Sequence, residues 1–180
     1  MSRDIIAWRH PQPESAQGRC LGARTDLPVQ GRRAKKLARR IQATARRERR
    51  AHEVWTSPLG RSAAVGRWLR RWGWRHVVEP GLLEIDFGAW DGLAWDTIAR
   101  AQLDAWVADF AGFAPAGGEN LATFMRRVAA CPLPPGALVV GHGGWMLARR
   151  WLATHAEGDV ASLRAAEWGA PPKYGQCWRL

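Results

Sequence analysis

The sequence predicts an α/β fold, a three-layer α/β/α sandwich around a mostly parallel central sheet. Short apolar runs alternate along the chain with longer amphipathic stretches, which is typical of helices that connect parallel strands. No internal repeat and no long polar linker interrupts this alternation. With 180 residues the chain is long enough for one substantial hydrophobic core. We therefore expect a single domain over residues 1–180.

The expected strands are short and apolar, and turn-forming or charged residues bound them. In chain order they are Asp4–Trp8, Val54–Thr56, His76–Val78, Ala137–Val140 and the closing segment 175–180. Between the first strand and the first helix, residues 11–28 carry turn residues throughout and are expected to form a loop.

The expected helices carry apolar residues at helical spacing. They cover residues 31–50, a stretch from about Ser57 to Trp72, residues 95–110, residues 121–130 and the segment after Gly144. The first is the clearest, because an apolar stripe follows the spacing i, i+3, i+4, i+7 and i+11. That stripe consists of Ala34, Leu37, Ala38, Ile41 and Ala45. Ser57 or a neighbour is expected to cap the second helix.

The formal net charge of +11 is unevenly distributed. Between Gly31 and His52, ten Lys and Arg residues accompany a single acid, Glu48. A nucleic-acid surface is one interpretation and the solvated outer face of a helix is the other. We favour the solvated face, because the apolar stripe explains the helix and no named nucleic-acid motif accompanies it. The twelve tryptophans are spread along the chain and are expected in the core or in pocket walls.

Several classes of protein are disfavoured by composition. No apolar run approaches the ~20 residues of a membrane span, and the four apolar residues after Asp4 are too few for a secretory signal. The cysteines are odd in number and lack CxxC spacing, which disfavours a disulfide scaffold or a zinc site. They are Cys20, Cys131 and Cys177. We expect a cytoplasmic protein without a metal or other cofactor, and no feature favours a particular oligomeric state.

Polar residues follow three of the predicted strands. Arg9 and His10 follow the first strand, residues 57–61 the second, and residues 141–144 the last buried one. Ligands of parallel sheets bind beyond the carboxyl ends of the strands. Arginine matches phosphate oxygens, histidine can act as a nucleophile, and glycines before a helix let backbone N–H groups approach an anion. The sequence thus predicts a phosphate pocket that contains a nitrogen nucleophile.

Five segments in order resemble the motifs of the histidine phosphatase superfamily, the phosphoglycerate-mutase-like proteins. They are AWRHPQPE, TSPLGRS, LLEIDFGAWDGL, PAGGEN and VVGHGG, and they span about residues 4–145. The short length and the segment GRCLGARTDLPV are most similar to the α-ribazole phosphatase branch. The resemblance implies a phosphoglycerate-mutase-like fold and a phosphomonoesterase that forms a phosphohistidine. It implies a small phosphate ester as substrate, with α-ribazole 5′-phosphate of cobalamin biosynthesis as the candidate.

Position by position, the resemblance implies a role for each matched residue. His10 would be the nucleophile and Glu84 the general acid, while Arg9, Arg61 and His142 would hold the phosphoryl oxygens. His10 must attack as neutral imidazole, so we expect a backbone carbonyl to hold its other nitrogen. His142 is expected to carry a positive charge.

Glu84 must start protonated in this scheme. Burial beside aromatic residues is expected to raise its pKa. The aromatic residues are Phe87, Trp90 and Trp95. Two nearby acids, Asp86 and Asp91, are favoured as turn-forming residues around glycines. Glu119 matches a family motif position, or it caps the next helix together with Asn120.

In the segment that follows His10, three positions differ from the family pattern. They are Pro11 for the usual glycine, Pro13 for a hydroxyl residue and Ala16 for an asparagine. These changes remove groups that could face phosphate, so other side chains would have to replace them. The candidate substrate-binding residues are Gln12, Gln17 and Arg19.

Other functions stay open at this point. A phosphoglycerate-mutase-like or sugar-phosphate phosphatase activity is one alternative. The short chain argues against a mutase, because a mutase must hold its intermediate away from water with extra lid segments. A catalytically weak protein that binds phosphate or nucleic acid is the other alternative.

Overall fold

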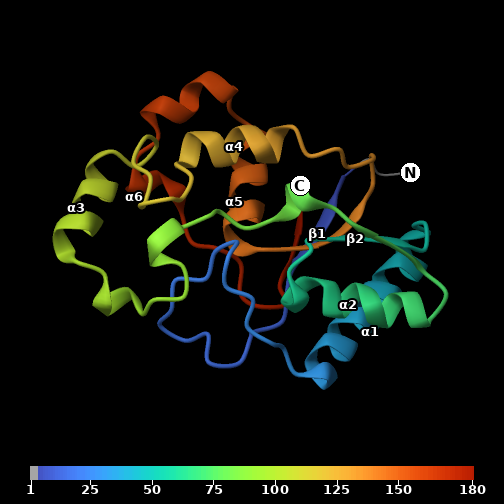
Figure 1. The fold of residues 1–180 in the computed structure, drawn as a ribbon. Helices are drawn as coiled ribbons and strands as arrows, with labels where there is room; N and C mark the ends of the chain where they lie inside the picture. Colours follow the sequence, from blue (N-terminus) through green and yellow to red (C-terminus); the bar gives the residue numbers. More distant parts are fainter. Residues whose placement is uncertain (1–3) are drawn as a thin grey trace.

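The computed structural model describes residues 4–180, apart from the side chains of residues 157 and 158, and shows one five-stranded sheet (Figure 1). The strands are β1 (Ile6–Arg9), β2 (Glu53–Thr56), β3 (Arg75–Val78), β4 (Leu138–Gly141) and β5 (Cys177–Arg179). Their order is β3-β2-β4-β1-β5, and only β5 is antiparallel to its neighbour. The predicted α/β fold with a mostly parallel sheet is confirmed. Residues 1–3, which precede the short apolar run that disfavours a secretory signal, lie outside the described part.

Helices cover both faces of the sheet, which gives the three layers (Figure 1). The α-helices are α1 (Gly31–Glu48), α2 (Gly60–Arg71), α3 (Arg100–Ala108), α4 (Leu121–Ala129), α5 (Gly143–Leu152) and α6 (Ala165–Trp168). Short 3₁₀ turns occur at Pro80–Leu82, Gly88–Trp90, Trp95–Thr97 and Glu157–Ser162. Helices α1 and α2 pack on one face, and α4 and α5 pack on the other.

Alternation along β1 shows how the sheet divides the core. Ile6 and Trp8 pack toward α1 and α2, whereas Ile5 and Ala7 pack with the cluster that contains α4 and α5. All four residues of β4 are buried, as expected of a strand covered on both faces. The strands that carry Arg9 and Gly141 are therefore fixed from both sides.

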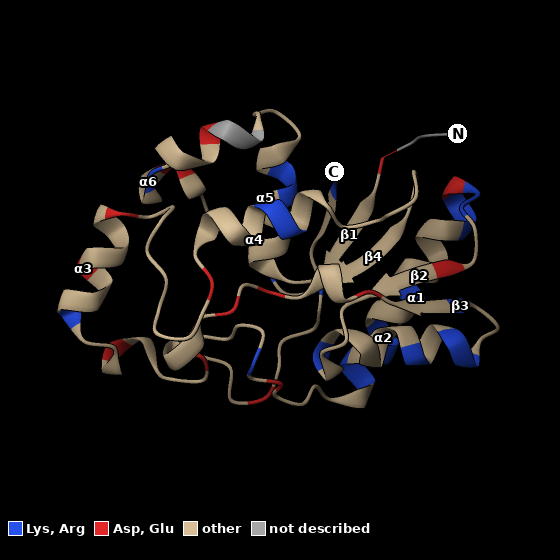
Figure 2. Ribbon diagram, turned by 45° about the horizontal axis from the view of Figure 1, so that its top comes forward, with Lys and Arg blue, Asp and Glu red and all other residues tan. Residues whose placement is uncertain are grey.

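Helix α1 buries the predicted apolar stripe in full. Most of its basic side chains point outward, and Figure 2 shows Lys and Arg gathered on α1 and α2. The helix ends near the expected residue, where Arg49 adopts a left-handed conformation and its N–H caps the last turn. The amphipathic prediction for this helix is confirmed.

Two predictions about the other helices are wrong. Residues 95–110 do not form one helix, because Ile98 is extended and buries its side chain against Cys20 and Trp90 between the Trp95–Thr97 turn and α3. Ser57 does not cap α2 either. Instead, the carboxylate of Asp26 caps this helix: it accepts a hydrogen bond from the backbone N–H of Gly60 at 2.6 Å.

The described residues, 4–180, include no helix that is long and apolar enough to cross a membrane. All three cysteines are free thiols, two of them buried.

Candidate active site

Four side chains meet at the carboxyl edge of the sheet, and we call them the cradle: Arg9, His10, Arg61 and His142. Strand β1 pairs in parallel with β4, which places Arg9 opposite Gly141 and brings the two histidines together. The N–H of His10 donates to the carbonyl of Gly141 at 3.0 Å, and the two imidazole centroids are 5.0 Å apart. Arg61 joins them from the first turn of α2.

The cradle is buried and its inner donors lack partners. His10 is 4% exposed, Arg61 1% and His142 0%. Outer nitrogens of the arginines donate to backbone: Arg61 to the carbonyl oxygens of Thr25 and Gly22, and Arg9 to that of Pro172 at 2.8 Å. Arg9 Nε, Arg61 Nε and His142 Nδ1 are buried with no hydrogen-bond partner among the described residues. A buried donor left unpaired costs about 1–3 kcal/mol, so these three nitrogens favour an anionic acceptor between them.

His10 is held as a neutral imidazole with one nitrogen available. Its Nδ1 lies 2.8 Å from the carbonyl oxygen of Pro11, which can only accept, so Nδ1 carries the proton and Nε2 keeps its lone pair. Burial, followed by the charge of Arg61, holds the pKa of His10 well below its usual value, against the opposing effect of the Pro11 carbonyl. The expected backbone carbonyl is confirmed. It belongs to Pro11, one of the residues that differ from the family pattern.

His142 is also neutral in the protein alone. Burial, then the charge of Arg61, lowers its pKa well below the usual value. The expected positive charge on His142 is therefore wrong for this environment, because desolvation and neighbouring cations both disfavour it. A phosphate dianion beside the ring would oppose the shift, so charging of His142 would accompany anion binding.

Ser57 fixes the orientation of His142, a role that the sequence did not reveal. Its hydroxyl lies 2.6 Å from His142 Nε2, and both side chains are fully buried. The bond leaves Nδ1 as the ring nitrogen without a hydrogen-bond partner in the described part of the chain. Only the position of Ser57 directly after β2 could have indicated this contact.

Substitution of Ser57 by alanine is expected to lower kcat about tenfold, because loss of one orienting hydrogen bond costs about 1.4 kcal/mol. Steady-state assays of phosphate release would measure it. Ser62→Ala is the matched control, since the Ser62 hydroxyl is equally buried but donates to the carbonyl of Val140. Equal losses in the two variants would contradict a positioning role for Ser57.

Glu84 lies at the edge of the cradle on the loop after the Pro80–Leu82 turn. Its carboxylate accepts the N–H of Gly144 at 2.9 Å and that of Ile85 at 3.1 Å. Burial raises the pKa of Glu84, and the two N–H groups with Arg61 and Arg9 partly offset the rise. The predicted direction is confirmed. Gly144 is required here, because a Cβ would lie 2.4 Å from the carboxylate.

Arg127 and Glu119 brace the Glu84 loop. Arg127 donates to the carbonyls of Leu83 and Glu84 at 3.0 and 3.1 Å, and it pairs with Glu119 at 2.5 Å. Glu119 also accepts the N–H of Asp86 at 3.0 Å. Of the two alternatives for Glu119, capping belongs to Asn120 alone, whose side chain accepts from the N-terminus of α4.

The two neighbouring aspartates organise loops, as favoured from the sequence. Asp86 accepts the N–H of Gly88 at 2.9 Å. Asp91 accepts the N–H groups of Gly22 and Arg24, at 3.0 and 2.9 Å, and so ties the early loop to the segment after Glu84. Both carboxylates are engaged in holding backbone.

The structure places the three candidate substrate-binding residues outside the cradle. Gln12 lines a groove together with Pro11, Tyr174 and basic residues of α1. Gln17 is exposed, and Arg19 donates to the carbonyl of Gly92 at 2.9 Å. Within the described chain, no hydrogen bond joins any of the three to the cradle.

The segment before β5 contacts the cradle instead. The ring centroid of Tyr174 lies 3.9 Å from the guanidinium carbon of Arg9. It lies 5.5 Å from the ring centroid of His10. Pro172 accepts from Arg9, and the N–H of Gly175 donates to the Arg9 carbonyl at 3.0 Å. Sequence reasoning missed these residues because they reach the site only through the pairing of β5 with β1.

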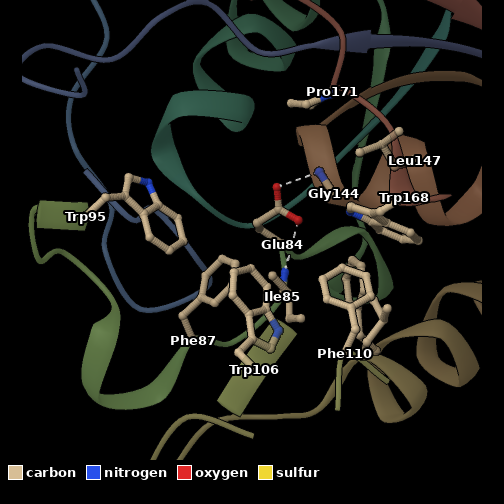
Figure 3. Close-up of a pocket in the computed structure, with 12 residues that line it drawn as sticks. Glu84, Ile85, Phe87, Trp95, Trp106, Phe110, Gly144, Leu147, Trp168 and Pro171 are labelled. Atoms are coloured by element: carbon tan, nitrogen blue, oxygen red, sulfur yellow. Dashed lines mark hydrogen bonds between the residues drawn. The ribbon is translucent and has the colours of Figure 1, made fainter. Parts of the chain in front are cut away.

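An aromatic cavity of about 270 Å³ opens beside Glu84 (Figure 3). Its walls come from the Glu84 loop, the Trp95–Thr97 turn, α3 to α6 and Pro171. They consist of Glu84, Ile85, Phe87, Trp95, Trp106, Phe110, Leu121, Phe124, Gly144, Leu147, Trp168 and Pro171. Two of the three aromatic residues expected near Glu84 line it, whereas Trp90 packs with Cys20 and Ile98. Glu84 and Gly144 belong both to this cavity and to the border of the cradle.

The fold and the site define an α/β protein with a buried arginine–histidine phosphate cradle. Residues 5–166 match the model of the histidine phosphatase superfamily (branch 1), and the chain belongs to this superfamily. Its members are phosphatases and mutases, so the family supports action on small phosphorylated substrates. A comparison with curated protein sequences gives no match.

Three solved structures show what the chain is similar to. The Thermus thermophilus protein TTHB049 is 30% identical with a TM-score of 0.63, over 81% of each chain. Phosphoglycerate mutase from the same organism is 25% identical with a TM-score of 0.71, over 98% of this chain and 92% of that one. Mycobacterial glucosyl-3-phosphoglycerate phosphatase in complex with VO3 shares the fold, with 22% identity and a TM-score of 0.72 over 98% and 91%.

Proposed function

We propose that residues 1–180 form a single, cytoplasmic histidine-phosphatase-like domain that hydrolyses small phosphate monoesters through a phosphohistidine. One observation carries the proposal. Arg9 Nε, Arg61 Nε and His142 Nδ1 are buried without a hydrogen-bond partner among the described residues. They lie beside His10, whose Nε2 is left free by the bond from Nδ1 to Pro11. This is the arrangement that an in-line attack on a phosphate group requires.

In the first step, His10 Nε2 attacks phosphorus and an N–P bond forms as the ester P–O bond breaks. Arg9, Arg61 and His142 stabilise the charge on the three other phosphoryl oxygens. Glu84 gives its proton to the departing oxygen, which leaves as an alcohol. The raised pKa of Glu84 favours the protonated form that this step consumes.

In the second step, water attacks the phosphohistidine. The Glu84 carboxylate takes the proton from the water as the new O–P bond forms and the N–P bond breaks. Inorganic phosphate leaves, and His10 returns to the neutral form with its proton on Nδ1. The cycle restores Glu84 to its protonated state.

For the substrate we propose α-ribazole 5′-phosphate, on the likeness of residues 18–29 to the α-ribazole phosphatase branch. In the fold this segment supports the cradle, because Gly22 and Thr25 accept from Arg61 and Asp26 caps α2. The support for this substrate therefore comes from the motif rather than from a substrate contact.

A phosphoglycerate-mutase-like activity is the second candidate, and the likeness to a phosphoglycerate mutase favours it. The chain spans 92% of that mutase, so its short length does not argue against a mutase as strongly as the sequence suggested. A sugar-phosphate phosphatase is a third candidate with the same chemistry. We assign no nucleic-acid role to α1, whose basic face accompanies a buried apolar stripe.

A panel of phosphorylated metabolites tests the proposal. We expect release of inorganic phosphate from α-ribazole 5′-phosphate at a higher kcat/KM than from 3-phosphoglycerate or glucose 6-phosphate. Phosphate release and ³¹P spectra of the products would be recorded together. Return of the phosphoryl group to a second hydroxyl, with little free phosphate, would instead identify a mutase, and no turnover of any ester would indicate a binding protein.

A further inference from the structure

Rings line the cavity beside Glu84 as a continuous series of contacts (Figure 3). Trp106 is central: its ring centroid lies 6.1 Å from that of Phe87, 6.2 Å from that of Trp95 and 5.4 Å from that of Phe110. Phe110 in turn contacts Trp168 at 6.1 Å. Several of these rings are half-buried, so part of their surface is exposed. Such a surface matches a flat, apolar guest.

The charge of the cavity limits what it can hold. Among the residues that line it in the described chain, Glu84 is the only titratable one, and no Lys or Arg is present. A carboxylate or second phosphate placed there would lose its hydration without gaining a cation. The cavity therefore disfavours the acidic alcohols of phosphoglycerate-type esters.

The volume indicates the size of the guest. Cavities of about 150 Å³ hold a benzene ring, so about 270 Å³ suits one aromatic ring or a fused pair of rings. The polar side-chain groups of its lining are the Glu84 carboxylate and the indole N–H groups of Trp95, Trp106 and Trp168. This favours an uncharged ring over a sugar with many hydroxyls.

Glu84 links the cavity to the chemistry of the cradle. A general acid must reach the oxygen that leaves, so the alcohol part of the ester lies on the Glu84 side of the phosphorus. Gly144, which donates to Glu84, lines the same cavity, and Pro171 lies against Gly143 next to Arg9. The alcohol therefore extends from the cradle directly into the ring-lined space.

We propose that this cavity is the leaving-group site and that it selects phosphate esters whose alcohol carries an uncharged aromatic or heteroaromatic ring. The inference rests on the proposed function for the direction in which the alcohol leaves. It differs from the activities named for two of the similar structures, whose substrates contain phosphoglycerate.

Primary alkyl esters with similar leaving groups test the selection: benzyl phosphate, propyl phosphate and 3-phosphoglycerate. We expect kcat/KM for benzyl phosphate to exceed that for propyl phosphate about tenfold or more, with 3-phosphoglycerate lowest. In Trp106→Ala the benzyl-to-propyl ratio should fall about tenfold, mainly through KM, because the ring loses its contact surface. Trp95→Ala is a second variant in the cavity lining, should Trp106→Ala fail to fold.

Trp72→Ala is the matched control, because Trp72 is half-buried and pairs with Trp68 at the end of α2, outside the cavity. Its ratio should equal that of the wild type. A wild-type ratio near one, or a preference for 3-phosphoglycerate, would overturn the inference and leave the phosphatase proposal standing. If no ester is hydrolysed, calorimetric titration with benzylphosphonate and propylphosphonate decides the inference separately: tighter binding of benzylphosphonate supports it, and equal binding overturns it.

Discussion

His10→Ala is expected to lower phosphatase activity about 10⁴-fold or more, because the variant has no group that can form the covalent intermediate. The side chain is buried, but among the described residues its hydrogen bond is to the neighbouring Pro11 carbonyl, so the fold should persist. Initial rates with p-nitrophenyl phosphate would measure the loss. A phosphorylated, acid-labile protein should be trapped with the wild type and not with the variant.

His155→Ala is the appropriate control for this experiment. His155 is exposed, lies outside the cradle and stacks on Trp151, with the two ring centroids 4.3 Å apart. Its rate should equal that of the wild type. Equal, slow hydrolysis by the wild type and His10→Ala would show that the phosphohistidine mechanism is wrong for this protein.

Glu84→Gln is expected to lower kcat for alkyl esters about 10²–10⁴-fold, since the leaving oxygen receives no proton from the amide. The loss should be much smaller for p-nitrophenyl phosphate, whose leaving group needs no acid. Glu14→Gln, at an exposed carboxyl in the early loop, is the control and should retain wild-type rates. Equal losses for both kinds of ester in Glu84→Gln would remove Glu84 from the role of acid.

The pH profile gives an independent readout of the same variant. Because the pKa of His10 is lowered, the nucleophile stays neutral at pH values below the usual histidine pKa of 6.5. Because the pKa of Glu84 is raised, the acid stays protonated at pH values above the usual glutamate pKa of 4.5. The wild type should therefore show a bell-shaped dependence of kcat/KM on pH. Activity falls at low pH as His10 gains a proton and at higher pH as Glu84 loses one. In Glu84→Gln the fall on the Glu84 side should disappear, while the His10 side should remain.

The sequence predicted which side chains meet at the carboxyl ends of the strands. Arg9, His10 and His142 could be placed because β1 and β4 are short, apolar and parallel, so their ends had to meet. Arg61 followed from the same logic at the start of α2. Glu84 was placed by resemblance. The direction of its pKa shift was predicted from burial, which is its main cause in the structure.

Contacts between distant segments could not be predicted. Ser57 meets His142 across 85 residues, and Asp26 caps α2 across 34. Local patterns carry no information about such pairs. The break at Ile98 has the same origin, because burial against Cys20 and Trp90 overrides the helical spacing of residues 95–110.

Pro11 shows how a departure from a family pattern can be absorbed. Proline removes one backbone N–H, but its carbonyl still fixes His10. The side chains suggested as replacements, Gln12, Gln17 and Arg19, lie elsewhere. Tyr174 and Pro172 approach Arg9 in the structure, so the support comes from the far end of the chain rather than from the loop itself.

Docking of strand β5 is therefore a late step in the assembly of the site during folding. The strand has three residues and lies at the sheet edge, where it pairs with β1 alone among the described strands. Its pairing with β1 nevertheless positions the preceding segment, which contacts Arg9. While the chain is being synthesised, Arg9 and His10 emerge early but stay incomplete until residues 172–179 have left the ribosome and docked. An edge strand this short also frays more readily than the core. Brief opening of β5 would release Arg9 while the rest of the sheet stays folded, so hydrogen exchange at β5 should be faster than at β4.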